Sequence, residues 1–174
     1  MPSFSSMKDL LEELTKQEFD IIVAITRGGM IPACLMAQLL NIRDIDALNI
    51  EYYSGASKTL EQPFIFPKRY DHINSRKVLV VDDLTESGKT LNFALDYLKQ
   101  FRPSDLKVFT VFKKKSSPFN PDYFLKEIPD EWVNFDYQKV YDFEPFFKYM
   151  QYVPAPTEPT TSTDSSTKTG FLEL

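Results

Sequence analysis

Apolar and polar positions alternate along the chain in blocks that predict strands and helices in turn. Short, continuous apolar runs are typical of strands buried on both faces of a parallel sheet, and apolar residues three and four apart are typical of helices. The runs predict strands at residues 21–26 (IIVAIT), 45–53 (IDALNIEYY), 78–81 (VLVV) and 107–112 (KVFTVF). The helical spacing predicts helices at residues 7–18, at residues 31–40 and from residue 91 onward. This alternation favours an α/β fold.

The most informative stretch runs from residue 78 to residue 90, VLVVDDLTESGKT. Its apolar strand leads into Asp82 and Asp83, which lie at the carboxyl end of the strand, where open α/β sheets bind ligands. The turn at residues 85–90 combines hydroxyl groups and a glycine with backbone N–H groups at a helix start, and this combination favours a phosphate group. These features together predict a site for a phosphorylated sugar.

Two other interpretations of this stretch are open at first. A nucleotide-binding P-loop also ends in Gly-Lys-Thr, but it needs a glycine five residues before Gly88, and Asp83 stands there. Spacing and charge therefore exclude a P-loop. Alternatively, the polar residues only cap a strand and a helix, since Asp, Ser and Thr are ordinary residues at helix starts. For the whole pattern we favour the ligand site.

A second strand-turn-helix unit lies at residues 20–40, with Arg27, Gly28 and Gly29 in its turn. Paired glycines let backbone N–H groups approach a ligand closely, and arginine can bind phosphate oxygens through two parallel hydrogen bonds. For these three residues alone, a tight turn with a solvated arginine is an equally good interpretation.

The stretch at residues 78–90 resembles the phosphoribosyl pyrophosphate (PRPP) motif of the type I phosphoribosyltransferases. The similarity is greatest to the enzymes that salvage the 6-oxopurines hypoxanthine, guanine and xanthine. The resemblance implies the type I fold, in which helices flank a central, mostly parallel sheet, with a small hood and a mobile loop. It also implies the reaction, in which a purine nitrogen displaces pyrophosphate from C1 of PRPP and a nucleoside 5′-monophosphate forms.

The resemblance assigns roles to both turns. Asp82 and Asp83 would bind the ribose hydroxyls and help to place Mg²⁺, a hard cation that prefers oxygen ligands. Arg27 and Gly28 would face the pyrophosphate, and the Thr26-Arg27 peptide bond is expected to be cis. The 5′-phosphate would lie against Thr85, Glu86, Ser87, Gly88, Lys89 and Thr90.

Glu86 is the expected catalytic residue. Related purine enzymes usually have an aspartate at this position, close to the purine N7, where it can exchange a proton with the base. Glutamate keeps the carboxylate but adds a methylene, which changes its reach. Ser87 stands where threonine is usual and keeps the hydroxyl.

A third segment supports the purine class, because three lysines, residues 113–115, follow the predicted strand at 107–112. Taken alone, they would be a solvated edge. The family places a lysine here that donates to the purine 6-oxo group; Lys114 matches best, and Lys113 and Lys115 match after a one-residue shift. An ammonium has donors and no acceptor, so it suits a carbonyl and disfavours the exocyclic amine of adenine.

The resemblance also assigns Trp132 to stacking on the base and the Val133 backbone to a hydrogen bond with its edge. By composition alone, the single tryptophan would be a core residue. Downstream, NFDYQKV lacks the Pro-Trp pair of the bacterial xanthine-guanine type, so the preferred base stays open.

Other functions compatible with a PRPP motif are a regulator that senses PRPP or a nucleotide, and an enzyme for orotate, adenine or uracil. Lys114, Glu86 and the Trp132 region favour the 6-oxopurine enzyme, because a sensor need not keep groups that handle a base. An unrelated α/β interaction protein would have no affinity for PRPP.

The segment at residues 54–76 corresponds to the mobile loop of the family. Lys58, Lys68 and Arg69 are expected to be solvated, and His72 is assigned neither metal binding nor catalysis. The family further implies a homo-oligomer, a dimer or a tetramer.

Composition limits the remaining choices. With 174 residues and 43% hydrophobic content, residues 1–152 are expected to form one phosphoribosyltransferase domain, and the Pro/Ser/Thr-rich residues 153–174 a disordered tail. The net charge of -5 argues against a nucleic-acid partner. Cys34, the single cysteine, is expected to be a small core residue and allows a reducing cytoplasm. With neither a leader nor a long apolar span, the sequence predicts no export and no membrane insertion.

Overall fold

The computed structural model describes residues 7–51, 54–55, 58–59, 63–131 and 133. The chain divides into two units, Met1–Glu131 and Trp132–Leu174. Val133 is the one described residue of the second unit, so the fold described below is that of the first. The predicted domain boundary near residue 152, and Trp132, lie outside the described residues.

The elements of the first unit alternate along the chain. The helices are α1 (Met7–Lys16), α2 (Met30–Leu40) and α3 (Lys89–Lys99), with a 3-10 helix at Asp71–Ile73. The strands are β1 (Ile21–Thr26), β2 (Ile45–Glu51), β3 (Ser54–Gly55), β4 (Lys58–Thr59), β5 (Phe64–Ile65), β6 (Lys77–Thr85), β7 (Asp105–Lys114) and β8 (Tyr123–Ile128). Among the described residues, no helix is long and apolar enough to cross a membrane.

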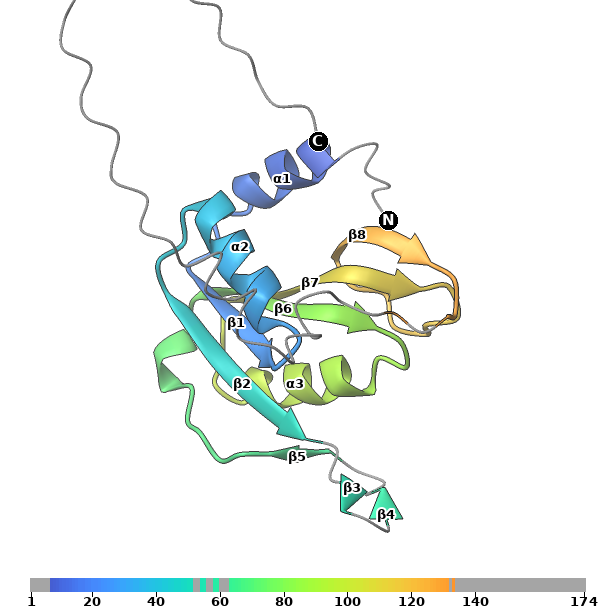
Figure 1. Cartoon of the computed structure of the whole chain (residues 1–174). Helices are drawn as coiled ribbons and strands as arrows, with labels where there is room; N and C mark the ends of the chain where they lie inside the picture. Colours follow the sequence, from blue (N-terminus) through green and yellow to red (C-terminus); the bar gives the residue numbers. More distant parts are fainter. Residues whose placement is uncertain (1–6, 52–53, 56–57, 60–62, 132, 134–174) are drawn as a thin grey trace, which may run out of the picture. The chain divides into compact units, whose positions relative to one another are not determined.

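Six strands form one sheet in the order β5-β2-β1-β6-β7-β8 (Figure 1). The pairs β2–β1, β1–β6, β6–β7 and β7–β8 are parallel, whereas β5 pairs with β2 in antiparallel fashion. Strands β3 and β4 form a separate antiparallel pair. The predicted α/β fold with a mostly parallel sheet is therefore confirmed.

The strand order reverses between β1 and β6. From β1 the chain passes through α2 to β2 on one side, and from β6 it passes through α3 to β7 on the other. In open α/β sheets such a reversal opens a crevice beyond the carboxyl ends of the two strands, and ligands bind there. The turns that follow β1 and β6 therefore begin at the same crevice.

Both faces of the sheet are covered, which explains the continuous apolar run of β1. Ile21, Val23 and Ile25 belong to the core that contains the buried face of α3. Ile22 and Ala24 belong to the opposite core, which contains buried residues of α1 and α2. Full burial of a side chain such as Ile22 or Val23 stabilises the fold by about 1.5–3 kcal/mol, so both faces of β1 contribute to stability.

Two strands extend beyond their predicted ends. Strand β6 runs on to Thr85 rather than ending at Val81, because its ladder with β7 continues through Asp82 and Leu84. Strand β7 likewise runs to Lys114. The acids therefore lie inside the end of the strand rather than after it.

Strand β8 was not predicted. It is one of the two edge strands of the six-stranded sheet, and its pattern, YFLKEI, mixes apolar and charged residues. The carboxylate of Asp122, just before β8, accepts a hydrogen bond from Val108 N of β7 at 2.9 Å. This tertiary contact, rather than apolar periodicity, aligns the start of β8 with β7.

The prediction that Cys34 is a core residue is wrong, because its side chain is exposed. Helix α2 has no charged residue and buries Pro32, Ala33, Met36 and Ala37. Its outer side carries large apolar residues, among them Leu35, which is 61% exposed. A helix that is apolar all round gives no periodic signal for the side that faces the core.

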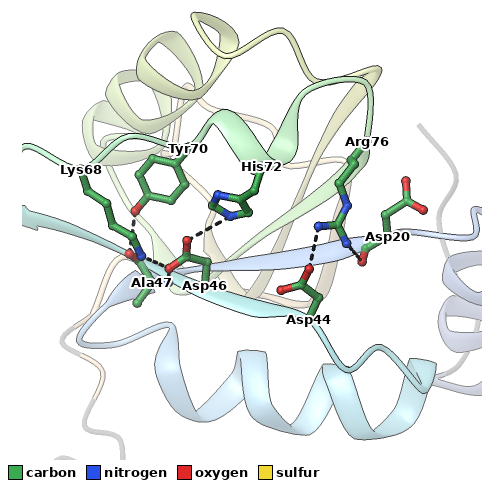
Figure 2. Close-up of polar contacts among 8 residues, drawn as sticks. All are labelled: Asp20, Asp44, Asp46, Ala47, Lys68, Tyr70, His72 and Arg76. Carbon is green, nitrogen blue, oxygen red and sulfur yellow. Dashed lines mark hydrogen bonds and ion pairs between the residues drawn. The ribbon is translucent and has the colours of Figure 1, made fainter.

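The segment at residues 63–76 is fastened to β2 by a group of polar contacts around Asp46 (Figure 2). The Asp46 carboxylate forms an ion pair with Lys68 and also contacts His72 Nε2 at 3.1 Å. Between them, the buried Tyr70 donates its hydroxyl to the carbonyl oxygen of Ala47 at 2.6 Å. The return of this long connection to the sheet is therefore fixed on β2.

We predict that Asp46→Ala lowers the free energy of unfolding by about 1 kcal/mol, because Lys68 and His72 lose their shared partner. Urea unfolding at pH 6 measures the effect. The matched control is Arg69→Ala, which removes an exposed ion pair with Asp71 in the same segment and should leave stability unchanged. Equal effects of the two substitutions would show that Asp46 does not fasten the segment.

Candidate active site

A polar cavity of about 300 Å³ lies at the carboxyl end of β6. It is lined by Asp82, Asp83, Leu84, Thr85, Glu86, Ser87, Gly88, Thr90 and Leu91. The structure thus brings both predicted acids and most of the predicted phosphate-binding residues to one cavity. Lys89 is not among the lining residues, and its side chain is exposed.

The turn between β6 and α3, residues 86–88, has a shape that requires glycine at its last position. Gly88 has a φ of 70°, in the left-handed region, and it caps the N-terminus of α3. A Cβ atom on Gly88 would also lie 2.1 Å from Phe119 Cβ. We call residues 85–90 the phosphate turn, because a helix N-terminus with hydroxyl groups beside it suits a phosphate.

The carboxylates of Asp82 and Asp83 differ in their environments. Asp82 is only 8% exposed, and burial, followed by the charge of Asp83, raises the pKa of the Asp82 carboxyl well above its usual range. One oxygen of Asp82 accepts a hydrogen bond from Asp83 N at 2.9 Å. Both residues nevertheless line the same cavity.

Asp83, which lies on β6 two residues before the phosphate turn, contacts the turn that follows β1. A Cβ atom on Gly28 would lie 2.3 Å from Asp83 Oδ2 and 2.6 Å from Asp83 Oδ1. A Cβ atom on Gly29 would lie 2.3 Å from the carbonyl oxygen of Val81. Both glycines are therefore needed for the first turn to pack directly against β6.

The start of the first turn agrees with the prediction, because the peptide bond between Thr26 and Arg27 is cis. The hydroxyl of Thr26 contacts Asn49 Oδ1 on β2 at 3.1 Å, so β2 supports this end of β1. The side chain of Arg27 is exposed at the beginning of the turn. An exposed guanidinium at this edge of the sheet is available to an anionic ligand.

Lys114 lies beside the phosphate turn. Its ammonium forms an ion pair with Glu86 Oε1 at 2.8 Å, and the side chain of Lys114 is 6% exposed, compared with 63% for Glu86. The side chain of Lys113 instead pairs with Glu127 on β8 at 3.0 Å. Lys115 is exposed. The interpretation of all three lysines as a solvated edge is therefore wrong for Lys113 and Lys114.

Two predicted residues of the base site lie beyond the first unit, and two residues that were not predicted contact the phosphate turn. Trp132 lies outside the described residues. Val133 is described but belongs to the second unit, so its predicted contact with a base stays a prediction. Ser117 and Phe119 contact the phosphate turn but were not predicted. Their loop reads in the sequence as an ordinary Pro-rich connection, and only the fold brings it to the turn.

The carboxylates offer a suitable set of donors for magnesium. Asp82 and Asp83 supply hard oxygen ligands at the edge of a polar cavity, and Mg²⁺ is usually held by one or two carboxylates, substrate phosphates and water. In the part of the chain that the structure describes, no group of three or more His, Cys, Asp and Glu side chains converges. A metal ion held by these two carboxylates would take its other ligands from water and from the oxygens of a bound phosphate compound.

The chain matches known proteins across most of its length. The family model of the phosphoribosyl transferase domain matches residues 4–142. The xanthine-guanine phosphoribosyltransferase of Chromohalobacter salexigens is 33% identical over 129 residues, which cover 74% of this chain and 75% of that protein.

Two solved structures share the fold. The purine phosphoribosyltransferase from Pyrococcus horikoshii has a TM-score of 0.64 and 28% identity, over 74% of this chain and 83% of that one. The Helicobacter pylori xanthine-guanine-hypoxanthine phosphoribosyltransferase has a TM-score of 0.57 and 25% identity, over 85% of this chain and 95% of that one. With its two turns meeting at the strand reversal and a family model that matches most of its length, this chain belongs to the phosphoribosyltransferase family.

Proposed function

We propose that the protein is a purine salvage phosphoribosyltransferase. It converts hypoxanthine, guanine or xanthine and PRPP to the nucleoside 5′-monophosphate and pyrophosphate. The observation that carries the proposal is the convergence of three groups at one crevice: the phosphate turn, Gly28 against Asp83, and Lys114 beside Glu86. The purine phosphoribosyltransferases among the similar proteins support the same class of acceptor.

In this proposal the two turns hold the two ends of PRPP. The phosphate turn binds the 5′-phosphate through hydroxyl and backbone N–H groups. Arg27 and Gly28 bind the pyrophosphate, and Asp82 and Asp83 bind the ribose hydroxyls. Bound Mg²⁺ would neutralise the charge that develops on the departing pyrophosphate. Fixing both ends also places C1 in line between the base and the leaving group, which lowers the entropic part of the barrier.

The base would meet Lys114 and Glu86. The Lys114 ammonium would donate to the 6-oxo group, and the Glu86 carboxylate would exchange a proton with N7 of the purine. In the structure these two groups pair with each other, because a buried ammonium needs a nearby countercharge. A bound purine carbonyl would replace the carboxylate on Lys114. Stacking of Trp132 on the base and a hydrogen bond from the Val133 backbone to its edge stay predictions from the family resemblance.

Nucleotide formation tests this function directly. Purified protein with PRPP and Mg²⁺ is offered hypoxanthine, guanine, xanthine and adenine separately, with Glu86→Ala alongside. We expect turnover of a 6-oxopurine and not of adenine, loss of turnover with EDTA, and strongly reduced turnover in the variant. Binding of PRPP without turnover of any base would favour a regulator of the same fold.

We predict that Lys114→Ala lowers kcat/KM for the 6-oxopurine about ten- to a hundredfold, since a hydrogen bond from a charged donor is lost. Steady-state kinetics at saturating PRPP measure the change. Lys115→Ala is the control, because Lys115 directly follows β7 and is exposed. The kinetics of this variant should match those of the unchanged protein. A larger loss of kcat/KM in Lys115→Ala than in Lys114→Ala would assign the contact with the 6-oxo group to Lys115 instead.

We predict that Gly28→Ala and Gly29→Ala affect different properties. The atoms nearest to a new Cβ at position 28 belong to the carboxylate of Asp83, which can rotate away, so PRPP binding should weaken at least about tenfold while the fold persists. The Cβ at position 29 meets backbone oxygens of Ile25 and Val81, so stability should fall by about 1–3 kcal/mol. PRPP titration and urea unfolding separate the two; the reverse pattern would contradict the geometry.

We further propose that the enzyme is a cytoplasmic homo-oligomer, a dimer or a tetramer. The net charge of -5 argues against a nucleic-acid partner. Leu35 and Leu39, 61% and 58% exposed on α2, offer apolar surface for self-association.

A further inference from the structure

The short connection after β7 packs directly against the phosphate turn. Thr85 Oγ1 and Ser117 Oγ lie 3.4 Å apart, and the two side chains are only 2% and 7% exposed. Ser117 Oγ donates to the carbonyl oxygen of Phe119 at 3.1 Å. A hydroxyl has one proton, so the Thr85 hydroxyl is the donor to Ser117. These contacts form a directed chain from the phosphate turn into the connection.

Phe119 supports the other end of the same turn. A Cβ atom on Gly88 would lie 2.1 Å from Phe119 Cβ, so the side chain of Phe119 packs directly on the backbone of Gly88. Phe119 also packs against the core that includes Leu91 of α3. The phosphate turn is therefore held at its first residue by Ser117 and next to the helix by Phe119.

Ser117 also reaches the lysine of the proposed base site. Ser117 N donates to the carbonyl oxygen of Lys114 at 3.0 Å, which closes the turn after β7. One residue thus contacts both the backbone of Lys114 and the hydroxyl of Thr85. The Lys114 side chain contacts the turn a second time, through Glu86.

We propose that Ser117 and Phe119 are positioning residues, which fix the phosphate turn relative to Lys114. The inference rests on the proposed function, in which the turn binds the 5′-phosphate and Lys114 binds the base. Neither residue is among those that line the cavity, so their effect on PRPP is transmitted through the turn. Rate depends on placing the ribose C1 next to the base, and small displacements of one binding group lower it strongly.

Steady-state kinetics of Ser117→Ala and Phe119→Leu test the proposal, with KM measured separately for PRPP and for the 6-oxopurine. We expect KM for PRPP to rise about three- to tenfold in each variant, because a buried hydroxyl loses its partner or a packed aromatic loses contacts. KM for the base should stay within about twofold, since the Lys114 side chain is unchanged. The midpoint of thermal unfolding is measured in parallel.

Ser116→Ala is the matched control. Ser116 lies in the same connection, but its hydroxyl donates to Asp130 at 2.6 Å and not to the phosphate turn. Its KM for PRPP should equal that of the unchanged protein. The proposal is overturned if Ser117→Ala and Phe119→Leu keep the PRPP KM of this control, or if both KM values rise together.

A failure of the proposed function is distinguishable from a failure of this inference. If the unchanged protein makes no nucleotide, the proposed function is wrong, and the increase in unfolding temperature on adding PRPP and Mg²⁺ replaces KM as the readout. A smaller increase for Ser117→Ala than for Ser116→Ala would then support the positioning role. Equal increases, or no increase in any form of the protein, would reject it.

Discussion

The contact between Gly28 and the Asp83 carboxylate is the constraint on which the site depends. A Cβ atom at position 28 would displace the Asp83 carboxylate, and the contact places the turn after β1 directly against the end of β6. The strand order makes this contact available, because the sheet reverses between these two strands. A ligand with two anionic ends can therefore contact both turns.

A second constraint comes from buried charge. Lys114 carries its ammonium in a nearly closed environment, and Glu86 is the group that balances it. Removing a charge from water is costly unless a partner is close, so Lys114 and Glu86 form an ion pair in the structure. In the proposed reaction the same two groups separate onto the oxo group and N7 of a purine. The extra methylene of Glu86, relative to the aspartate usual in the family, gives its carboxylate a longer reach.

Much of this arrangement could be predicted from the sequence, because local chemistry controls it. The apolar run of β1 and the glycines at positions 28, 29 and 88 predicted two strand-turn-helix units, and the structure confirms both units. Helix α2 shows the limit of such reasoning: without charges or polar periodicity, nothing in its sequence distinguishes the buried Ala33 from the exposed Cys34.

The contacts that the sequence could not predict are those that depend on tertiary structure. Strand β8 lies at the sheet edge and mixes apolar with charged residues, so it lacks the signal of a buried strand. Ser117 and Phe119 come from a polar connection, and only the ladder between β6 and β7 brings them to the phosphate turn. The sequence alone predicts that the lysines after Phe112 are exposed to solvent, yet two of them, Lys113 and Lys114, are the buried last residues of β7.

The most direct test of the central claim is calorimetric titration of PRPP into the free protein, with and without Mg²⁺, for the unchanged chain and for Asp83→Asn. The account predicts Mg²⁺-dependent binding that weakens at least about tenfold in the variant, because an isosteric amide removes the charge at the meeting point of the two turns. Absence of PRPP binding, or equal binding by both forms of the protein, would contradict it.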